Sequence, residues 1–84
     1  MKPTNVRYKG EILTLTEHYG RPCLFIQKPS QINMPKMRFV GGYPNEYCIY
    51  ISELTEEEKR SIKSVWGRRL DVDRLIAETQ EQES

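Results

Sequence analysis

The segment Glu11–Gln27, EILTLTEHYGRPCLFIQ, decides the fold class of this 84-residue chain. Its first half alternates β-branched residues with Leu13 and Leu15, which is typical of a half-buried strand. The residues HYGRP then interrupt the pattern, and an apolar run follows at Cys23–Gln27. Because the link is short, the segment predicts an antiparallel hairpin of two strands.

Further strand signals lie on both sides of this hairpin. A short alternating stretch predicts a strand at Val6–Tyr8. Downstream, strands are expected at Met37–Val40 and Tyr47–Ile51. The glycine- and proline-rich turn Gly41–Asn45 separates them. All four to five strands come before the first helical signal.

A helix start follows the strands. Thr55 can accept a hydrogen bond from a backbone N–H of the first turn, and Glu58 stands three residues later, as a capping box requires. Ile62, Val65 and Trp66 then recur at helical spacing, which predicts an apolar stripe packed on the sheet.

The end of this helix has two interpretations. Gly67 can terminate it, with a second helix starting at Asp71 and a hydrophobic staple between Leu70 and Leu75. Alternatively, one long helix runs through Gly67 at a cost of ~1 kcal/mol relative to alanine. The pattern alone does not decide between them.

Strands first and helix last predict an α+β fold. We expect a small, mostly antiparallel sheet of four to five strands followed by a C-terminal helix or helix pair. A curled, SH3-like sheet is the close alternative. Residues 1–77 would form one domain, and residues 78–84 a polar, frayed tail.

Composition narrows the class of protein. The hydrophobic fraction of 37% and the charged fraction of 30% suit a soluble folded chain. No apolar run approaches the ~20 residues that a membrane span needs, and the N-terminus has no apolar signal region. A cytoplasmic protein with no membrane contact is therefore expected.

The chain offers few groups for catalysis or metal binding. Cys23 and Cys48 lie in apolar segments and are interpreted as buried thiols, with a disulfide as the alternative if their strands are neighbours. The only histidine, His18, lies in an expected turn without a nucleophile motif beside it. No metal-ligand spacing is present. We therefore expect no enzyme, no metal and no cofactor.

Charge is unevenly distributed along the chain. Residues 1–52 carry seven basic and three acidic side chains, whereas residues 53–84 carry six basic and nine acidic ones. The first part is thus a mildly basic body, which favours an anionic partner.

The basic side chains of the body alternate with aromatic residues, a combination typical of single-stranded nucleic-acid binding. The leading hypothesis is therefore a small regulatory protein that contacts nucleic acid through a basic, aromatic sheet surface and the loop 28–36. The residues predicted to take part are Arg7, Lys9, Arg21, Lys28, Lys36, Arg38 and Tyr43.

The loop 28–36 also supports an alternative. Ile32 and Met34 are apolar, and Pro29 and Pro35 stiffen the loop at both ends. The chain would then be a protein–protein interaction module, such as a phage- or plasmid-type inhibitor or adaptor, using this loop and the C-terminal helix. That helix could also form a homodimer. The opposite interpretation is that Ile32 or Met34 plugs the core.

One stretch resembles a known family. LFIQKPS, Leu24–Ser30, followed by a basic strand and a helix, resembles the LFV-x-MPS stretch of the SpoVG septation regulators, over about a third of the chain. The resemblance implies nucleic-acid binding. The lysine before Pro29 departs from that pattern, and the strand at Tyr47–Ile51 has no counterpart in it.

Overall fold

The computed structural model describes residues 2–83, with side chains described through residue 78. In chain order, the elements are β1 Thr4–Tyr8, β2 Glu11–His18, β3 Arg21–Phe25, η1 Pro29–Asn33, β4 Arg38–Gly41, β5 Glu46–Tyr50, η2 Ile51–Glu53, α1 Glu56–Arg60, β6 Lys63–Ser64 and α2 Val72–Glu83. The fold is α+β, as the order of signals predicted.

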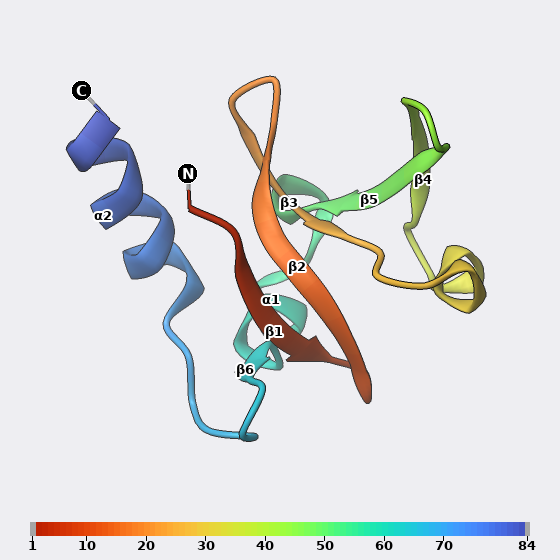
Figure 1. The fold of residues 1–84 in the computed structure, drawn as a ribbon. Coiled ribbons are helices and arrows are strands. Elements are labelled where there is room, and N and C mark those ends of the chain that lie inside the picture. Colours follow the sequence, from red (N-terminus) through yellow and green to blue (C-terminus); the bar gives the residue numbers. More distant parts are fainter. Residues whose placement is uncertain (1, 84) are drawn as a thin grey trace.

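The sheet is antiparallel and open, and has six strands in the order β4-β5-β3-β2-β1-β6. The predicted hairpin is confirmed, with Thr16 opposite Cys23 in the β2–β3 register. After β3 the chain passes through η1, forms the edge strand β4 and returns as β5 against β3 (Figure 1). The expected count of four to five strands was too small, because β6 was not predicted.

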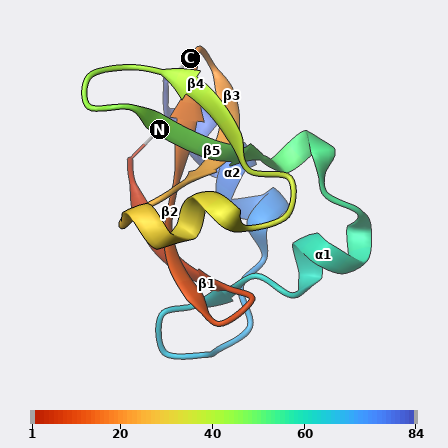
Figure 2. The ribbon, with the colours of Figure 1, turned by 90° about the vertical axis from the view of Figure 1, so that its right-hand side faces the viewer.

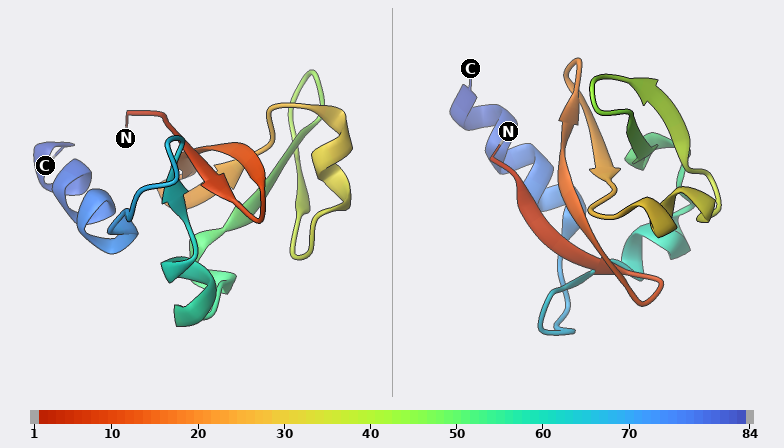
Figure 3. Two further views of the ribbon diagram at one scale, coloured as in Figure 1. Left: turned by 90° about the horizontal axis from the view of Figure 1, so that it is seen from below. Right: turned by 45° about the vertical axis from the view of Figure 1, so that its right-hand side comes forward.

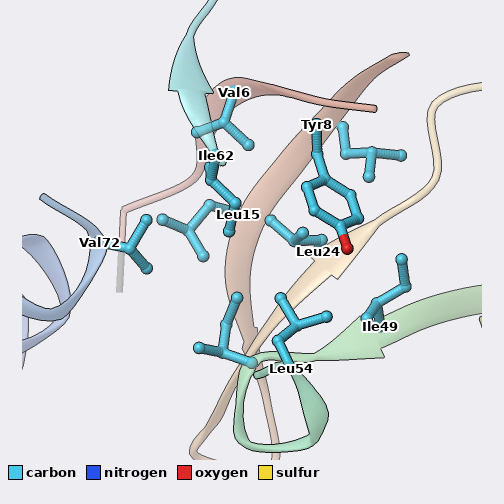
Figure 4. Close-up of a cluster of buried hydrophobic side chains, with 10 residues drawn as sticks. Val6, Tyr8, Leu15, Leu24, Ile49, Leu54, Ile62 and Val72 are labelled. Atoms are coloured by element: carbon cyan, nitrogen blue, oxygen red, sulfur yellow. The ribbon is translucent and has the colours of Figure 1, made fainter. Parts of the chain in front are cut away.

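One cluster of apolar side chains forms the main core. Strands β1, β2, β3 and β5 each contribute to it, and residues from η2 to α2 close it. Figure 4 shows these side chains converging from the sheet and from the start of α2. The buried members are Val6, Tyr8, Leu13, Leu15, Leu24, Ile49, Ile51, Leu54, Ile62 and Val72.

The opposite face of the sheet carries a smaller cluster. Cys23 and Cys48 are fully buried there beside Tyr50, with Phe25 and Val40 packed against them. Both cysteines are free thiols, in agreement with the interpretation as buried thiols. Burial raises the pKa of both, which makes them poor nucleophiles.

Helix α1 begins as predicted and ends earlier. The Thr55 hydroxyl accepts a hydrogen bond from the Glu58 N–H (3.1 Å), and the Glu58 carboxylate accepts one from the Thr55 N–H (2.8 Å). The helix stops at Arg60. The prediction of a helical stripe through Ile62, Val65 and Trp66 is wrong.

The reason is the open edge of β1. The residues after α1 pair with this edge as β6, with Val6 opposite Ser64 and Arg7 opposite Lys63, so that backbone groups of β1 gain partners. Trp66 lies in the loop after β6 and is 84% exposed.

The C-terminal region therefore holds two separate helices rather than one. The Asp71 carboxylate accepts a hydrogen bond from the Arg74 N–H (3.1 Å) and caps α2, which agrees with the interpretation that a second helix starts at Asp71. Leu70, Leu75 and Ile76 pack against the main core. Figure 3 shows α2 at the side of the sheet opposite to the β4–β5 hairpin.

Two predictions concern α2: a homodimer through this helix and a frayed tail at its end. Because its apolar residues contact the core of their own chain, the packing does not support the homodimer. The backbone of the predicted tail 78–84 is helical through Glu83, and Ser84 lies outside the described residues. Fraying of this tail stays a prediction.

The loop 28–36 is neither a free loop nor a simple plug. It contains the short helix η1, which lies below the β4–β5 hairpin in Figure 2. Gln31, only 2% exposed, anchors it to the sheet, and Met34 packs against the core, whereas Ile32 is exposed. Met34 thus fills the core as the second interpretation expects, and a protein contact through the exposed Ile32 stays a prediction.

Candidate functional site

Two of the predicted binding residues, Lys36 and Arg38, form ion pairs within the chain. Lys36 Nζ lies 2.6 Å from Glu58 Oε1 and also donates to the Glu53 carbonyl (3.0 Å). The Arg38 guanidinium lies 2.8 Å from a Glu53 carboxylate oxygen. The hydrogen bond from Lys36, aided by that from the Thr55 N–H, lowers the pKa of Glu58 to about 2. These two cations are thus largely neutralised where they lie.

Of the other predicted cations, Lys9 and Lys28 both lie beside the start of β2, whereas Arg21 lies at the opposite end of the β2–β3 hairpin. Arg21 stacks on the Tyr50 ring (3.8 Å to its centroid), and Lys28 lies 3.8 Å from Glu11 at an exposed position. Lys9 lies at the β1–β2 turn, 5.6 Å from the centroid of the Tyr8 ring. The structure does not bring them together into one patch.

The aromatic residues also do not lie together on one surface. Tyr8 and Tyr50 are buried, whereas Tyr19, Phe39 and Tyr43 are exposed. Tyr19 belongs to the β2–β3 turn and Tyr43 to the β4–β5 turn. The basic, aromatic sheet surface expected from the sequence is therefore not a single surface.

A different loop combines an exposed aromatic ring with cations. We call residues 63–69 the Trp66 loop. Its two ends are bridged, Lys63 opposite Arg69, and the Ser64 N–H donates to the Arg68 carbonyl (2.9 Å). The Ser64 hydroxyl accepts from the Arg68 N–H (3.1 Å), and the Gly67 N–H donates to the Ser64 carbonyl (2.8 Å). These bonds hold Trp66 outward at the tip of an ordered loop.

The neighbouring strand supports this loop. The Arg7 guanidinium donates to the Val65 carbonyl (3.1 Å), so one predicted cation does belong to the loop's surroundings. Gly67 adopts a φ of +79°, a left-handed conformation that favours glycine at this turn. The loop lies at the lower end of the molecule in Figure 1, between β6 and α2.

The charged residues that flank Trp66 in the sequence are of one sign. Residues 59–70 contain five basic and no acidic side chains, and Trp66 is the only tryptophan of the chain. Within residues 2–78, the side chains of Arg60, Lys63, Arg68 and Arg69 have no hydrogen-bond or ion-pair partner. The local charge run could have revealed this site from the sequence. Over the longer segment 53–84, nine acidic side chains outnumber six basic ones, so the total charge of that segment does not show the local basic run.

The second surface of interest is a groove of about 500 Å³ beside the loop 28–36. Segments Phe25–Pro29 and Pro44–Tyr47 form its two walls, and Thr14 contributes from β2. Phe39 packs its ring on that of Tyr47 (5.3 Å between centroids) and remains exposed. The lining of the groove combines apolar residues (Phe25, Ile26, Pro29, Pro44 and Tyr47) with polar ones (Thr14, Gln27, Lys28, Asn45 and Glu46).

No protein-family model, no curated protein and no solved structure matches this chain. The resemblance of Leu24–Ser30 to the septation regulators is therefore not supported by a family match. Function has to be inferred from the geometry of this molecule alone.

The geometry around His18 does not form a recognisable reaction centre. The residue ends β2, half-buried, where Nδ1 lies 3.0 Å from the Tyr50 hydroxyl, rather than in an exposed turn as predicted. In the part of the chain that the structure describes, no cluster of three or more metal-ligating side chains occurs. Across those same residues, no helix has the length and apolar character to cross a membrane.

Proposed function

We propose that this chain is a small, non-catalytic protein that binds single-stranded nucleic acid through the Trp66 loop. The observation that carries the proposal is one exposed tryptophan held on an ordered loop among cations that have no side-chain partner within residues 2–78. An indole held outward on a fixed loop presents a large planar apolar face with a polar N–H, which suits contact with a partner and favours a binding role for Trp66.

The chemistry of single strands fits this arrangement. Unpaired bases stack on aromatic rings, at about 1–3 kcal/mol per base, while Lys and Arg side chains contact the phosphates. The hydrogen bonds of the loop lower the ordering cost of binding, because the ring is already positioned. Lys36 and Arg38, which are engaged with glutamates, have a secondary role in this proposal.

Titration with a short oligonucleotide tests the proposal directly. Because Trp66 is the only tryptophan, quenching of the intrinsic fluorescence reports stacking at this one residue. We expect single-stranded DNA or RNA to quench it and a duplex of the same length to do so poorly. Binding should weaken with salt, since phosphate contacts release counterions.

A pair of variants measures the contribution of the ring. Trp66→Ala should lower affinity by about 5- to 150-fold, the equivalent of ~1–3 kcal/mol, in an anisotropy assay with a labelled strand. Tyr43→Ala is the matched control, because Tyr43 is also fully exposed but lies on the distant β4–β5 turn. Equal effects of the two substitutions would contradict the proposal.

The second candidate is a protein–protein interaction module, for which the groove beside the loop 28–36 is the specific observation. It predicts that Ile32→Asp removes a bound protein in a pull-down while the fold survives, since Ile32 is 40% exposed. Met34→Asp should instead destabilise the fold, because Met34 packs on the core. Tyr19→Asp, on another exposed turn, is the control. Retention of the partner by the Ile32 variant would exclude the exposed face of the loop 28–36 as the contact surface.

A further inference from the structure

A cleft of about 380 Å³ opens between α1 and the start of α2, next to the base of the Trp66 loop. This volume corresponds to about a dozen water molecules at ~30 Å³ each, enough for a phosphate group with part of its hydration shell. The side chains that line it are mostly charged: Glu56, Lys59, Arg60, Lys63, Arg69, Leu70, Asp71, Val72 and Asp73.

The three carboxylates of the cleft already have partners. Lys59 Nζ lies 2.9 Å from Glu56 and 3.3 Å from Asp73, and these hydrogen bonds raise the pKa of Lys59. The Asp71 carboxylate accepts the Arg74 N–H as the cap of α2. Four cations against these three carboxylates leave the cleft with a formal charge of +1, and the printed contacts of the carboxylates are with Lys59 and the Arg74 N–H rather than with the remaining cations.

Three cations of the cleft have no such partner. Arg60, Lys63 and Arg69 come from α1, β6 and the end of the Trp66 loop, and within residues 2–78 none of their side chains forms an ion pair or a hydrogen bond. Three cations converging on one hollow from separate elements are suited to an anion with several oxygens, because guanidinium and ammonium groups donate to phosphate oxygens.

The cleft and Trp66 are parts of one surface. Lys63 and Arg69 are bridged at the base of the loop, and Trp66 stands three residues from each. At ~3.6 Å per residue or less, Trp66 lies within about 11 Å of both along the chain. A short run of nucleotides can span this distance.

We propose that this cleft holds one phosphate group of the strand whose base stacks on Trp66. The inference rests on the proposed function and specifies the ligand: a single strand with an unpaired base and a charged backbone phosphate a short distance away. A duplex does not satisfy both contacts, because its bases are not available for stacking.

The experiment compares adjacent arginines. Arg69 lines the cleft, whereas Arg68, its neighbour on the same loop, does not. Both are exposed and neither side chain has a partner within residues 2–78, so Arg69→Ala and Arg68→Ala should both fold normally, as circular dichroism can verify. Their affinities are measured by anisotropy with labelled pentanucleotides of DNA and of RNA.

Each variant is tested with two backbones, the natural phosphodiester and the uncharged methylphosphonate. We expect Arg69→Ala to weaken phosphodiester binding about tenfold, the equivalent of one charge-assisted contact, and Arg68→Ala by less than about threefold. With the uncharged backbone, Arg69→Ala should have no effect. Quenching of Trp66 at saturation should stay the same in every case, because the stacking contact is untouched.

The possible failures are distinguishable. If strands quench Trp66 but Arg69→Ala and Arg68→Ala weaken binding equally, the charge acts diffusely and the cleft is not a phosphate site. The same conclusion follows if Arg69→Ala also weakens the uncharged strand. If neither DNA nor RNA strands bind or quench Trp66, the proposed function itself is overturned, and the inference with it.

Discussion

Gln31 should be the polar side chain whose loss costs the fold most. Its Oε1 accepts from the backbone N–H of Gln27 (2.6 Å) and of Lys28 (3.2 Å). Its Nε2 donates to the Ile12 carbonyl (2.9 Å) and to Glu11 Oε1 (3.2 Å). Both lone pairs and both protons of the amide are thus satisfied at a buried position.

Gln31→Ala removes all four bonds at once. Each hydrogen bond contributes ~0.5–1.5 kcal/mol net, and a buried partner group that no water can reach after the substitution adds a further cost. The free energy of unfolding should therefore fall by about 3 kcal/mol. A domain of this size has roughly 4–13 kcal/mol in total. Urea unfolding followed by far-ultraviolet circular dichroism measures the change as a lower midpoint with an unchanged slope.

Gln27→Ala is the matched control for this measurement. The Gln27 amide also forms side-chain hydrogen bonds, to Asn5 (2.9 Å) and Thr14 (3.0 Å), but at the exposed surface. Its loss should cost under about 1 kcal/mol, because water replaces the lost partners. If Gln31→Ala costs no more than Gln27→Ala, burial of the amide is not what anchors the loop.

Gln31→Glu keeps the acceptor oxygen of this side chain and removes its N–H donors. A carboxylate still accepts from Gln27 and Lys28, but has no proton for the Ile12 carbonyl and lies beside Glu11. Burial and this neighbour should raise the pKa of the new carboxyl above its value in the unfolded chain. The folded state then favours the protonated form, so the deficit relative to wild type should shrink as pH falls from 7 to about 4. A deficit independent of pH would contradict this account.

Two further substitutions test local contacts. Lys36→Met should raise the depressed pKa of Glu58 from about 2 toward its ordinary value of 4.5. The stability that Glu58 contributes to the wild type is present above pH 4.5 and is lost as pH falls toward 2. The free energies of unfolding of the variant and the wild type should therefore differ most above about pH 5 and become equal near pH 2. Unfolding midpoints across this range would reveal any failure to converge. Asp71→Ala should lower the free energy of unfolding by about 1 kcal/mol, because it removes the cap of α2. Asp71→Asn should restore most of this stability in the same assay. Equal losses for the two variants would show that the cap is unimportant.

The predictable part of the fold depends on short-range signals. The β2–β3 hairpin follows from alternation and a short link, and the start of α1 follows from the capping box at Thr55. In each case the residues that decide the conformation lie within a few positions of one another. The +4 body and the aromatic residues also led to the expectation of a nucleic-acid partner, which stays a proposal.

The candidate site was not predictable in the same way. Lys36 and Arg38 are free cations in the sequence, but the fold brings Glu58 and Glu53 against them. Only a local charge count over residues 59–70 indicates the cations around Trp66, and even that count leaves the exposure of the ring undecided.

The sequence by itself determined the α+β class, the central hairpin and the point at which the first helix begins. Only the tertiary structure decided that Lys63–Ser64 pairs with β1 instead of continuing a helix, that Gln31 is buried, and that Trp66 faces solvent. The physical reason is that these outcomes depend on backbone groups far away in sequence. The open edge of β1 and the carbonyl of Ile12 need partners, and satisfying them outweighs the local helical pattern.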